Sequence, residues 1–189
     1  MTIDSSGIFD SAERIVYDCG CRDPFIAARD IGVYIDYIDE FKDLLGMITV
    51  VNGEKHILLN NSMCDVRKRI VCAHELGHGV LHRSQLSECG GFRDVGSCYI
   101  TDILEYEANA FAAHLLIDNN DIMERIRDYS NVSGLAQGMN TELDLMLIKL
   151  NEMKRLGYDV NVPMETNARF LSDLGPDSCG RSDGFSDGV

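Results

Sequence analysis

A short motif, His74-Glu75-Leu76-Gly77-His78, carries the residue types of a hydrolytic metal site. On a helix, two histidines four residues apart lie about 40° apart around the axis and one turn apart along it, so both imidazoles can reach one ion at about 2.0 Å. Glu75 flanks this pair without replacing a ligand, where a carboxylate can act as base on a water held by the metal. The motif therefore predicts a divalent metal bound by His74 and His78, with Glu75 as the catalytic acid and base.

The surroundings of the motif bear on whether it is a metal site or a pair of core histidines. Apolar residues, among them Ile70, Leu76 and Val80, lie on both sides of the two histidines, and a helix that is apolar nearly all round is buried. Two buried imidazoles need polar partners, and a shared cation is the simplest one. The alternative is two neutral, hydrogen-bonded histidines of the core. A third ligand elsewhere in the chain would favour the metal.

A second predicted helix, residues 101–117, offers two carboxylates, Glu105 and Glu107. At about 100° per residue, Glu107 falls in the middle of an apolar stripe that includes Phe111 and Leu115, whereas Glu105 falls on the far side. A lone carboxylate in such a stripe is costly unless it is paired or metal-bound. We therefore expect Glu107 to be the third metal ligand and Glu105 to face water. Two imidazoles and one carboxylate form a ligand set of catalytic zinc, so Zn²⁺ is the expected cofactor.

Four further side chains have open roles near this site. His82 lies two turns from His74, about 11 Å away, which is too far to share an ion easily. It either supports a ligand from outside the metal shell or is an ordinary packed histidine. A donor for the tetrahedral oxyanion is also needed, and Tyr99, Tyr106 and His114 are the candidates. For His114 the alternative is a satisfied core histidine.

The elements that must position these residues are a small sheet and two long helices. Three β-rich runs precede the motif, over residues 33–38, 44–51 and 55–60. Asn52-Gly53 between the last two predicts a tight hairpin. The motif helix is expected over residues 63–82, with Asn61 or Ser62 as its N-cap, and a long loop, 83–100, follows it. These elements indicate an α+β fold, with a three-stranded sheet packed on a buried motif helix and further helices after it.

The chain resembles the ImmA/IrrE family of zincin-like metallopeptidases. The resemblance rests on Ala73-His74-Glu75-Leu76-Gly77-His78 and on the downstream block Glu107-Ala108-Asn109-Ala110-Phe111-Ala112. It implies a zincin-like fold, zinc ligands His74, His78 and Glu107, and Glu75 as the catalytic acid and base. The compact form is similar to members from mobile genetic elements, which cleave a helix-turn-helix transcriptional repressor. Where the family usually has Pro after the Leu pair, this chain has Ile117-Asp118.

Two functions follow as hypotheses. The first is a zinc endopeptidase that cleaves one protein substrate, a repressor if the resemblance extends so far. The second is a non-catalytic protein on a zincin scaffold that binds and sequesters a DNA-binding protein, for which an acidic surface would suit a basic partner.

Composition bounds the remaining possibilities. The 189 residues carry a formal net charge of −14, which disfavours direct nucleic-acid binding. No apolar run approaches the roughly 18 residues of a membrane span, and the first ten residues do not resemble a secretory signal. We therefore expect a cytoplasmic protein without membrane contact, with its seven cysteines reduced. The expected domains are a metallopeptidase domain, a helix-turn-helix-like extension and a disordered acidic tail, over residues 1–118, 119–160 and 161–189.

Overall fold

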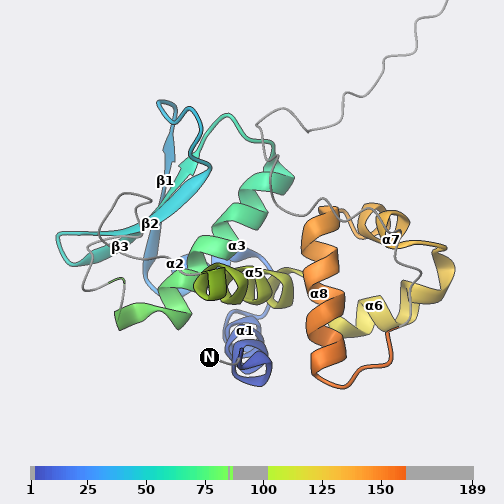
Figure 1. Cartoon of the computed structure of the whole chain (residues 1–189). Coiled ribbons are helices and arrows are strands. Elements are labelled where there is room, and N and C mark those ends of the chain that lie inside the picture. The colour runs from blue at the N-terminus through green and yellow to red at the C-terminus, as the bar shows by residue number, and fades with distance from the viewer. Residues whose placement is uncertain (1–2, 85, 87–101, 161–189) are drawn as a thin grey trace, which may run out of the picture.

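The computed structural model describes residues 3–84, 86 and 102–160 of the chain (Figure 1). The described elements follow in the order α1 (Ser5–Cys19), α2 (Pro24–Asp30), β1 (Val33–Ile38), β2 (Gly46–Val51), β3 (Glu54–Asn60), α3 (Asp65–Leu81), α5 (Asp102–Leu116), α6 (Asn119–Arg125), the 3-10 helix η1 (Ile126–Asp128), α7 (Val132–Gly138) and α8 (Leu143–Arg155). The tail predicted to be disordered, residues 161–189, and nearly all of the predicted loop 83–100 lie outside the described residues.

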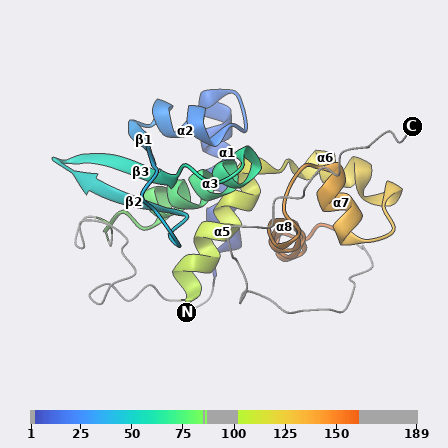
Figure 2. The same cartoon turned by 90° about the horizontal axis from the view of Figure 1, so that it is seen from above.

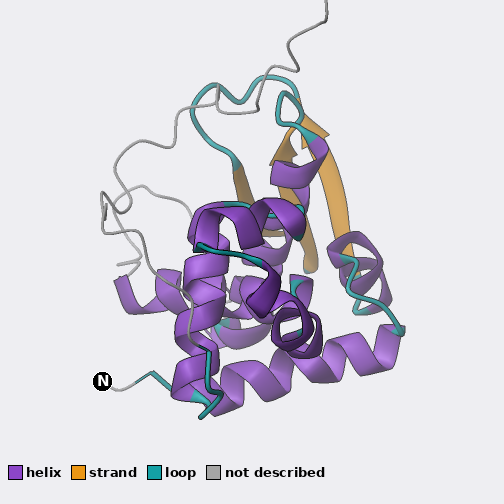
Figure 3. Ribbon diagram, turned by 90° about the vertical axis from the view of Figure 1, so that its right-hand side faces the viewer, coloured by secondary structure: helices purple, strands orange, loops and turns teal. Residues whose placement is uncertain are grey.

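The three strands form a mixed sheet in the order β1-β3-β2, in which β1 is parallel and β2 antiparallel to β3. The hairpin between β2 and β3 turns at Asn52 and Gly53, whose φ angles are 52° and 85°. Positive φ at both central residues is the geometry that Asn-Gly favours in a tight hairpin, so this prediction is confirmed. Figure 3 shows the strands gathered at one side of the molecule, with helices making up the rest.

Helix α3 lies between the sheet and α5, and two glycines bring these neighbours close. A Cβ on Gly79 would lie 2.6 Å from Cδ1 of Ile48 in β2. A Cβ on Gly77 would lie 3.1 Å from both the Cα and the carbonyl oxygen of Ala108 in α5. Because a larger residue at position 77 would meet the backbone of α5, Gly77 sets how closely α5 approaches the motif helix, whereas Gly79 lies against the sheet. The motif helix is therefore buried, as its apolar pattern predicts.

The C-terminal end of α5 is fixed by Arg22, which lies between α1 and α2. Its Nη1 donates to the carbonyl oxygens of His114 at 2.8 Å and Leu115 at 3.4 Å. The same guanidinium pairs with Glu13 and Asp118. A cation at a helix C-terminus satisfies carbonyl groups that have no partner within the helix. Arg22 thereby fixes the end of α5 to the first helices of the chain.

Helix α8 packs against α5, and α5 lies between α3 and α8 in two perpendicular views (Figures 1 and 2). Polar contacts cross this boundary: the Tyr106 hydroxyl donates to Glu152 at 2.7 Å, and Lys149 Nζ lies 3.0 Å from Nδ1 of His114. Helix α8 thus contributes to the core next to α5. The division of the chain at residue 118 stays a prediction.

The α+β class is confirmed, with the small sheet packed on the motif helix and further helices toward the C-terminus. The N-cap of α3 differs from the expectation, because it is Cys64 rather than Asn61 or Ser62. The Asn60 side chain accepts the Ser62 backbone N–H at 2.9 Å. Such a side-chain turn competes with helix formation, and α3 consequently begins later than predicted.

The cysteines follow the expectation only in part. Cys19, Cys21 and Cys72 are free thiols, whereas Cys64 is disulfide-bonded. Among the described helices, none combines the length and the apolar character that a membrane crossing requires.

Candidate metal centre

The two motif histidines converge through the same ring atom. Nε2 of His74 and Nε2 of His78 lie 3.1 Å apart, and the His78 side chain is almost fully buried. Both residues lie on α3, one turn apart, as the spacing predicts. The pair presents two imidazole nitrogens to one point in space, which is the arrangement that a shared cation requires.

The carboxylate that reaches these nitrogens is that of Glu105. One Glu105 oxygen lies 3.4 Å from Nε2 of His74 and the other lies 3.3 Å from Nε2 of His78. Ligand atoms at the corners of a tetrahedron around zinc, with bonds of 2.0–2.1 Å, are separated by about 3.3 Å. The Glu105 distances end on its two different oxygens, so the carboxylate lies beside both nitrogens. Within the described residues the three side chains form a group that could hold a metal.

The negative charge of Glu105 also supports its grouping with His74 and His78. Burial alone would raise the pKa of Glu105, but hydrogen bonds to His74 and His78 outweigh burial and hold that pKa well below its usual range. Glu105 is thus an anion between two imidazoles, and an anionic carboxylate is the form that binds a metal.

Glu107, the expected third ligand, lies elsewhere in the structure. Its carboxylate is 3.1 Å from Nε2 of His82 and does not join the cluster of His74, His78 and Glu105. Helix α5 contacts α3 at Ala108, and at about 100° per residue Glu105 and Glu107 lie on opposite sides of Ala108. The expectation that Glu105 faces water away from α3 is therefore wrong.

The apolar stripe of α5 did not identify the face that meets α3, because α5 is enclosed on several sides. Its contacts are with α1, α3 and α8, and residues from Ala110 to Leu115 are all buried. When a helix is buried nearly all round, the centre of its apolar residues does not identify the face toward one particular neighbour. The small residue at the helix crossing, Ala108, is the better guide.

Asn109 orients one of the histidines, a role that the sequence analysis did not predict. Its Oδ1 lies 2.9 Å from Nδ1 of His74. An amide oxygen accepts a hydrogen bond from Nδ1–H, which leaves the Nε2 lone pair of His74 free for a cation. Asn109 follows Glu105 by one helical turn, and this spacing was the available signal.

The other histidine is oriented by His82. Nδ1 of His78 lies 3.0 Å from Nδ1 of His82, whose Nε2 faces Glu107. His82 is 3% exposed. Of the two roles expected for His82, the structure therefore supports the first, in which His82 lies outside the cluster and contacts the proposed ligand His78.

Glu75 lies beside the cluster in a buried position. Its Oε2 accepts a hydrogen bond of 2.8 Å from the backbone N–H of Ile48 in β2. Burial raises the pKa of Glu75 above its ordinary value, against the lowering effects of His74 and of the Ile48 hydrogen bond. A carboxylate whose pKa is moved toward neutrality can both accept and return a proton, as acid–base catalysis requires.

Two of the three expected oxyanion donors have other partners. The Tyr106 hydroxyl is bonded to Glu152 and Asn151 of α8. His114 is fully buried next to Lys149, so it is a core histidine, but among the described residues its Nε2 has no hydrogen-bond partner and it is not fully satisfied. Tyr99 lies outside the described residues, so its role stays a prediction.

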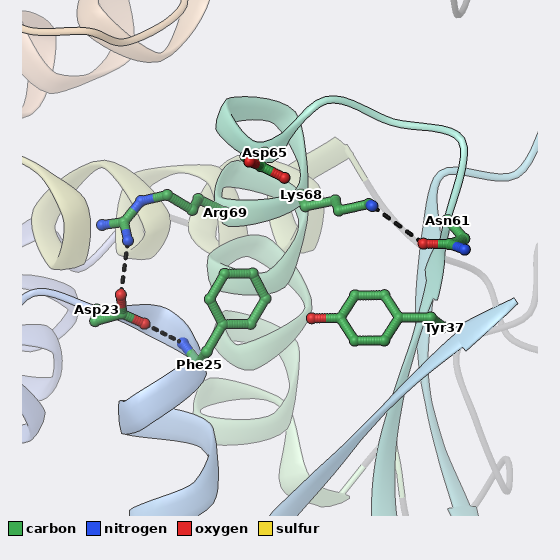
Figure 4. Close-up of a pocket in the computed structure, with 7 residues that line it drawn as sticks. All are labelled: Asp23, Phe25, Tyr37, Asn61, Asp65, Lys68 and Arg69. Atoms are coloured by element: carbon green, nitrogen blue, oxygen red, sulfur yellow. Dashed lines mark hydrogen bonds and ion pairs between the residues drawn. The ribbon is translucent and has the colours of Figure 1, made fainter.

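A separate cavity of about 270 Å³ lies at the N-terminal end of α3 (Figure 4). It is lined by Asp23, Phe25, Tyr37, Asn61, Asp65, Lys68 and Arg69. Two of its charged side chains bind neighbours in the lining: Arg69 pairs with Asp23, and Lys68 donates to Asn61. None of the cluster residues lines it, so this cavity is not the metal centre.

Similarity to a known family covers the part of the chain that holds this site. The family described as the IrrE N-terminal-like domain, Peptidase_M78, matches residues 26–151, which include the whole cluster. A protein of Bacillus phage phi105, named Uncharacterized immunity region protein 2, is 26% identical over 121 residues. That alignment covers 62% of this chain and 75% of the phage protein.

Proposed function

Because the chain belongs to the IrrE N-terminal-like domain family, we propose that it is a zinc-dependent endopeptidase. His74, His78 and Glu105 would hold the metal. The observation that carries the proposal is the convergence of two Nε2 atoms and one carboxylate at separations of 3.1–3.4 Å. Separations of this size suit the ligands of one zinc ion, and a site with three protein ligands keeps a position open for chemistry.

The chain's own residues would manage the proton. When bound, zinc would polarise the scissile carbonyl and lower the pKa of a water in its open position. Glu75 holds the Ile48 N–H at Oε2, which leaves Oε1 to take the proton of the attacking water. The raised pKa of Glu75 also suits the second transfer, in which the carboxylic acid passes the proton to the leaving amine.

The position of β2 favours a peptide substrate over a small molecule. Within the described residues β2 is an outer strand that pairs only with β3. Its Ile48 N–H is directed at Glu75, so the outer edge of the strand borders the catalytic group. An extended peptide can add to such an edge through backbone hydrogen bonds, which would bring a scissile bond close to Glu75.

We further propose that the substrate is a helix-turn-helix repressor. The name of the phage relative refers to an immunity region, and the resemblance to compact members of the family points to the same class of substrate. The formal net charge of −14 is complementary to a basic DNA-binding protein.

The proposal is tested by incubating the zinc-loaded protein with a repressor encoded beside it, followed by mass spectrometry of the products. Cleavage at one defined bond, absent with Glu75→Gln and with chelator, is the expected result. A stable complex that forms equally with wild type and Glu75→Gln, with no cleavage, would instead favour the non-catalytic binding function.

A further inference from the structure

Two buried histidines and a half-buried glutamate form a continuous chain that starts at one proposed ligand of the metal centre. Nδ1 of His78 lies 3.0 Å from Nδ1 of His82, and Nε2 of His82 lies 3.1 Å from the Glu107 carboxylate. The His78 and His82 side chains are each 3% exposed and that of Glu107 is 22% exposed. Hydrogen bonds in such a buried position are worth more than on the surface, because water competes poorly for the same groups.

The hydrogens on this chain can be assigned in one consistent way. If Nε2 of His78 offers its lone pair to a metal, the neutral ring carries its hydrogen on Nδ1. That hydrogen is donated to Nδ1 of His82, which must then be the acceptor nitrogen. His82 therefore carries its own hydrogen on Nε2 and donates it to the Glu107 carboxylate. Each of the two contacts has one donor and one acceptor, and the carboxylate end fixes the direction.

We propose that Glu107 and His82 are positioning residues that hold His78 in the tautomer and ring orientation that bind metal. This inference rests on the metal site of the proposed function. In this proposal Glu107 is not a metal ligand, although the proposed ligand Glu105 lies only two residues away. It acts on His78 through His82, as Asn109 acts directly on His74.

In this arrangement one helix, α5, supplies or orients much of the metal centre. Helix α5 carries three residues of this arrangement at every second position: Glu105, Glu107 and Asn109. One supplies a ligand atom and the other two orient the two histidines of α3. The close contact of Gly77 with Ala108 therefore places one ligand and both orienting groups at once.

The first test is metal affinity, measured by competition with a chromophoric chelator. Loss of an orienting partner of a metal-bound histidine weakens binding about 10- to 100-fold, and we expect this loss for Glu107→Ala. Glu107→Gln keeps an oxygen that can accept the His82 hydrogen, so it should recover part of the loss. The exposed Glu124→Ala in α6 is the matched control and should bind as wild type does.

A double-mutant cycle tests whether the two residues act as one chain. If Glu107 acts only through His82, the variant His82→Ala/Glu107→Ala should bind metal as His82→Ala alone does. Additive losses would contradict the chain. So would a Glu107→Ala loss larger than that of Glu105→Ala, because Glu107 would then be the ligand itself.

The second test is spectroscopic and uses the protein without metal, with Glu105→Ala as the background, because the Glu105 carboxylate would otherwise compete for a hydrogen on Nε2 of His78. Nitrogen-15 shifts of the histidine rings at about pH 8, where an ordinary imidazole is neutral, report which nitrogen carries the hydrogen. We expect His78 to be protonated at Nδ1 in Glu105→Ala and to become a mixture of tautomers in Glu105→Ala/Glu107→Ala. An unchanged His78 spectrum together with unchanged affinity would overturn the proposal. If wild type itself binds no zinc, the proposed function fails, a result that is distinct from the behaviour of the Glu107 variants.

Discussion

The Glu75 carboxylate accepts a 2.8 Å hydrogen bond from the backbone N–H of Ile48, so the candidate catalytic base is tied to the outer strand of the sheet. This bond fixes one carboxylate oxygen and the side-chain torsions behind it. It also makes the position of Glu75 depend on the packing of Ile48 against Gly79. The sheet therefore takes part in the chemistry by orienting the base as well as by supporting α3.

Glu75→Gln should abolish most of the activity without removing the metal. Glutamine keeps the shape and can still accept the Ile48 N–H, but it cannot accept a proton from water. We expect cleavage to fall about 10²- to 10⁴-fold, while zinc content, measured by elemental analysis, stays at the wild-type value. Loss of zinc together with activity would contradict the separate roles of Glu75 and the ligands.

Zinc should stabilise the folded protein through the three proposed ligands. A ligand that binds only the folded state at about 100 times its dissociation constant adds about 2.7 kcal/mol to the free energy of unfolding. Thermal or chemical denaturation with and without zinc measures this gain. His74→Ala and Glu105→Ala should lose it. A full zinc effect in Glu105→Ala would show that the carboxylate is not a ligand.

Gly77→Ala should damage both stability and metal binding. The new Cβ would lie 3.1 Å from backbone atoms of Ala108, which cannot move aside as a flexible side chain can. We expect a loss of about 1–3 kcal/mol in the free energy of unfolding and weaker zinc binding, because α5 carries Glu105. Gly134→Ala in α7 is the control, since its new Cβ would meet only side-chain atoms, at 3.3 Å. Wild-type zinc affinity in Gly77→Ala would contradict the role given to this contact.

Lys149 should make stability depend on pH. Burial, followed by the charge of Arg22, lowers the pKa of Lys149 to about 7. Between about pH 7 and the ordinary lysine pKa of about 10.4 the unfolded chain binds more protons at this residue, so stability rises with pH, by at most about 1.4 kcal/mol per pH unit. Below pH 7 lysine is charged in both states and the unfavourable burial of the charge is complete.

Denaturation of wild type and Lys149→Met at several pH values between 7 and 9 checks this. The difference in unfolding free energy between the two proteins should change with pH in the stated direction. Parallel pH profiles would show that Lys149 keeps its proton in the folded state over this range.

Much of the fold could be predicted because its signals are local. Asn52-Gly53 specifies a hairpin whatever surrounds it, and the Asp23 side chain caps α2 directly before Pro24. The spacing of His74 and His78 likewise sets their relation on any helix. The third proposed ligand, a carboxylate, could not be identified in this way, because its identity depends on which face of α5 meets α3. That is decided by a tertiary contact between Gly77 and Ala108, and the apolar pattern of a helix enclosed on several sides does not encode it.

The orienting residues were hidden for a related reason. Asn109 and Glu107 are recognisable only once the contact of α5 with α3 is known, because each acts on a histidine about 30 residues away in the chain. His82 could be placed in part from the sequence, since it continues the His74-His78 spacing by one more turn. Its partner could not be predicted.

The central claim is that His74, His78 and Glu105 surround one zinc ion. Crystals of the protein grown with zinc, measured on both sides of the zinc absorption edge, test it most directly. The account predicts one anomalous peak about 2.0–2.2 Å from Nε2 of both histidines and from a Glu105 oxygen. A peak that contacts Glu107 instead, or no peak between the two histidines, would contradict it.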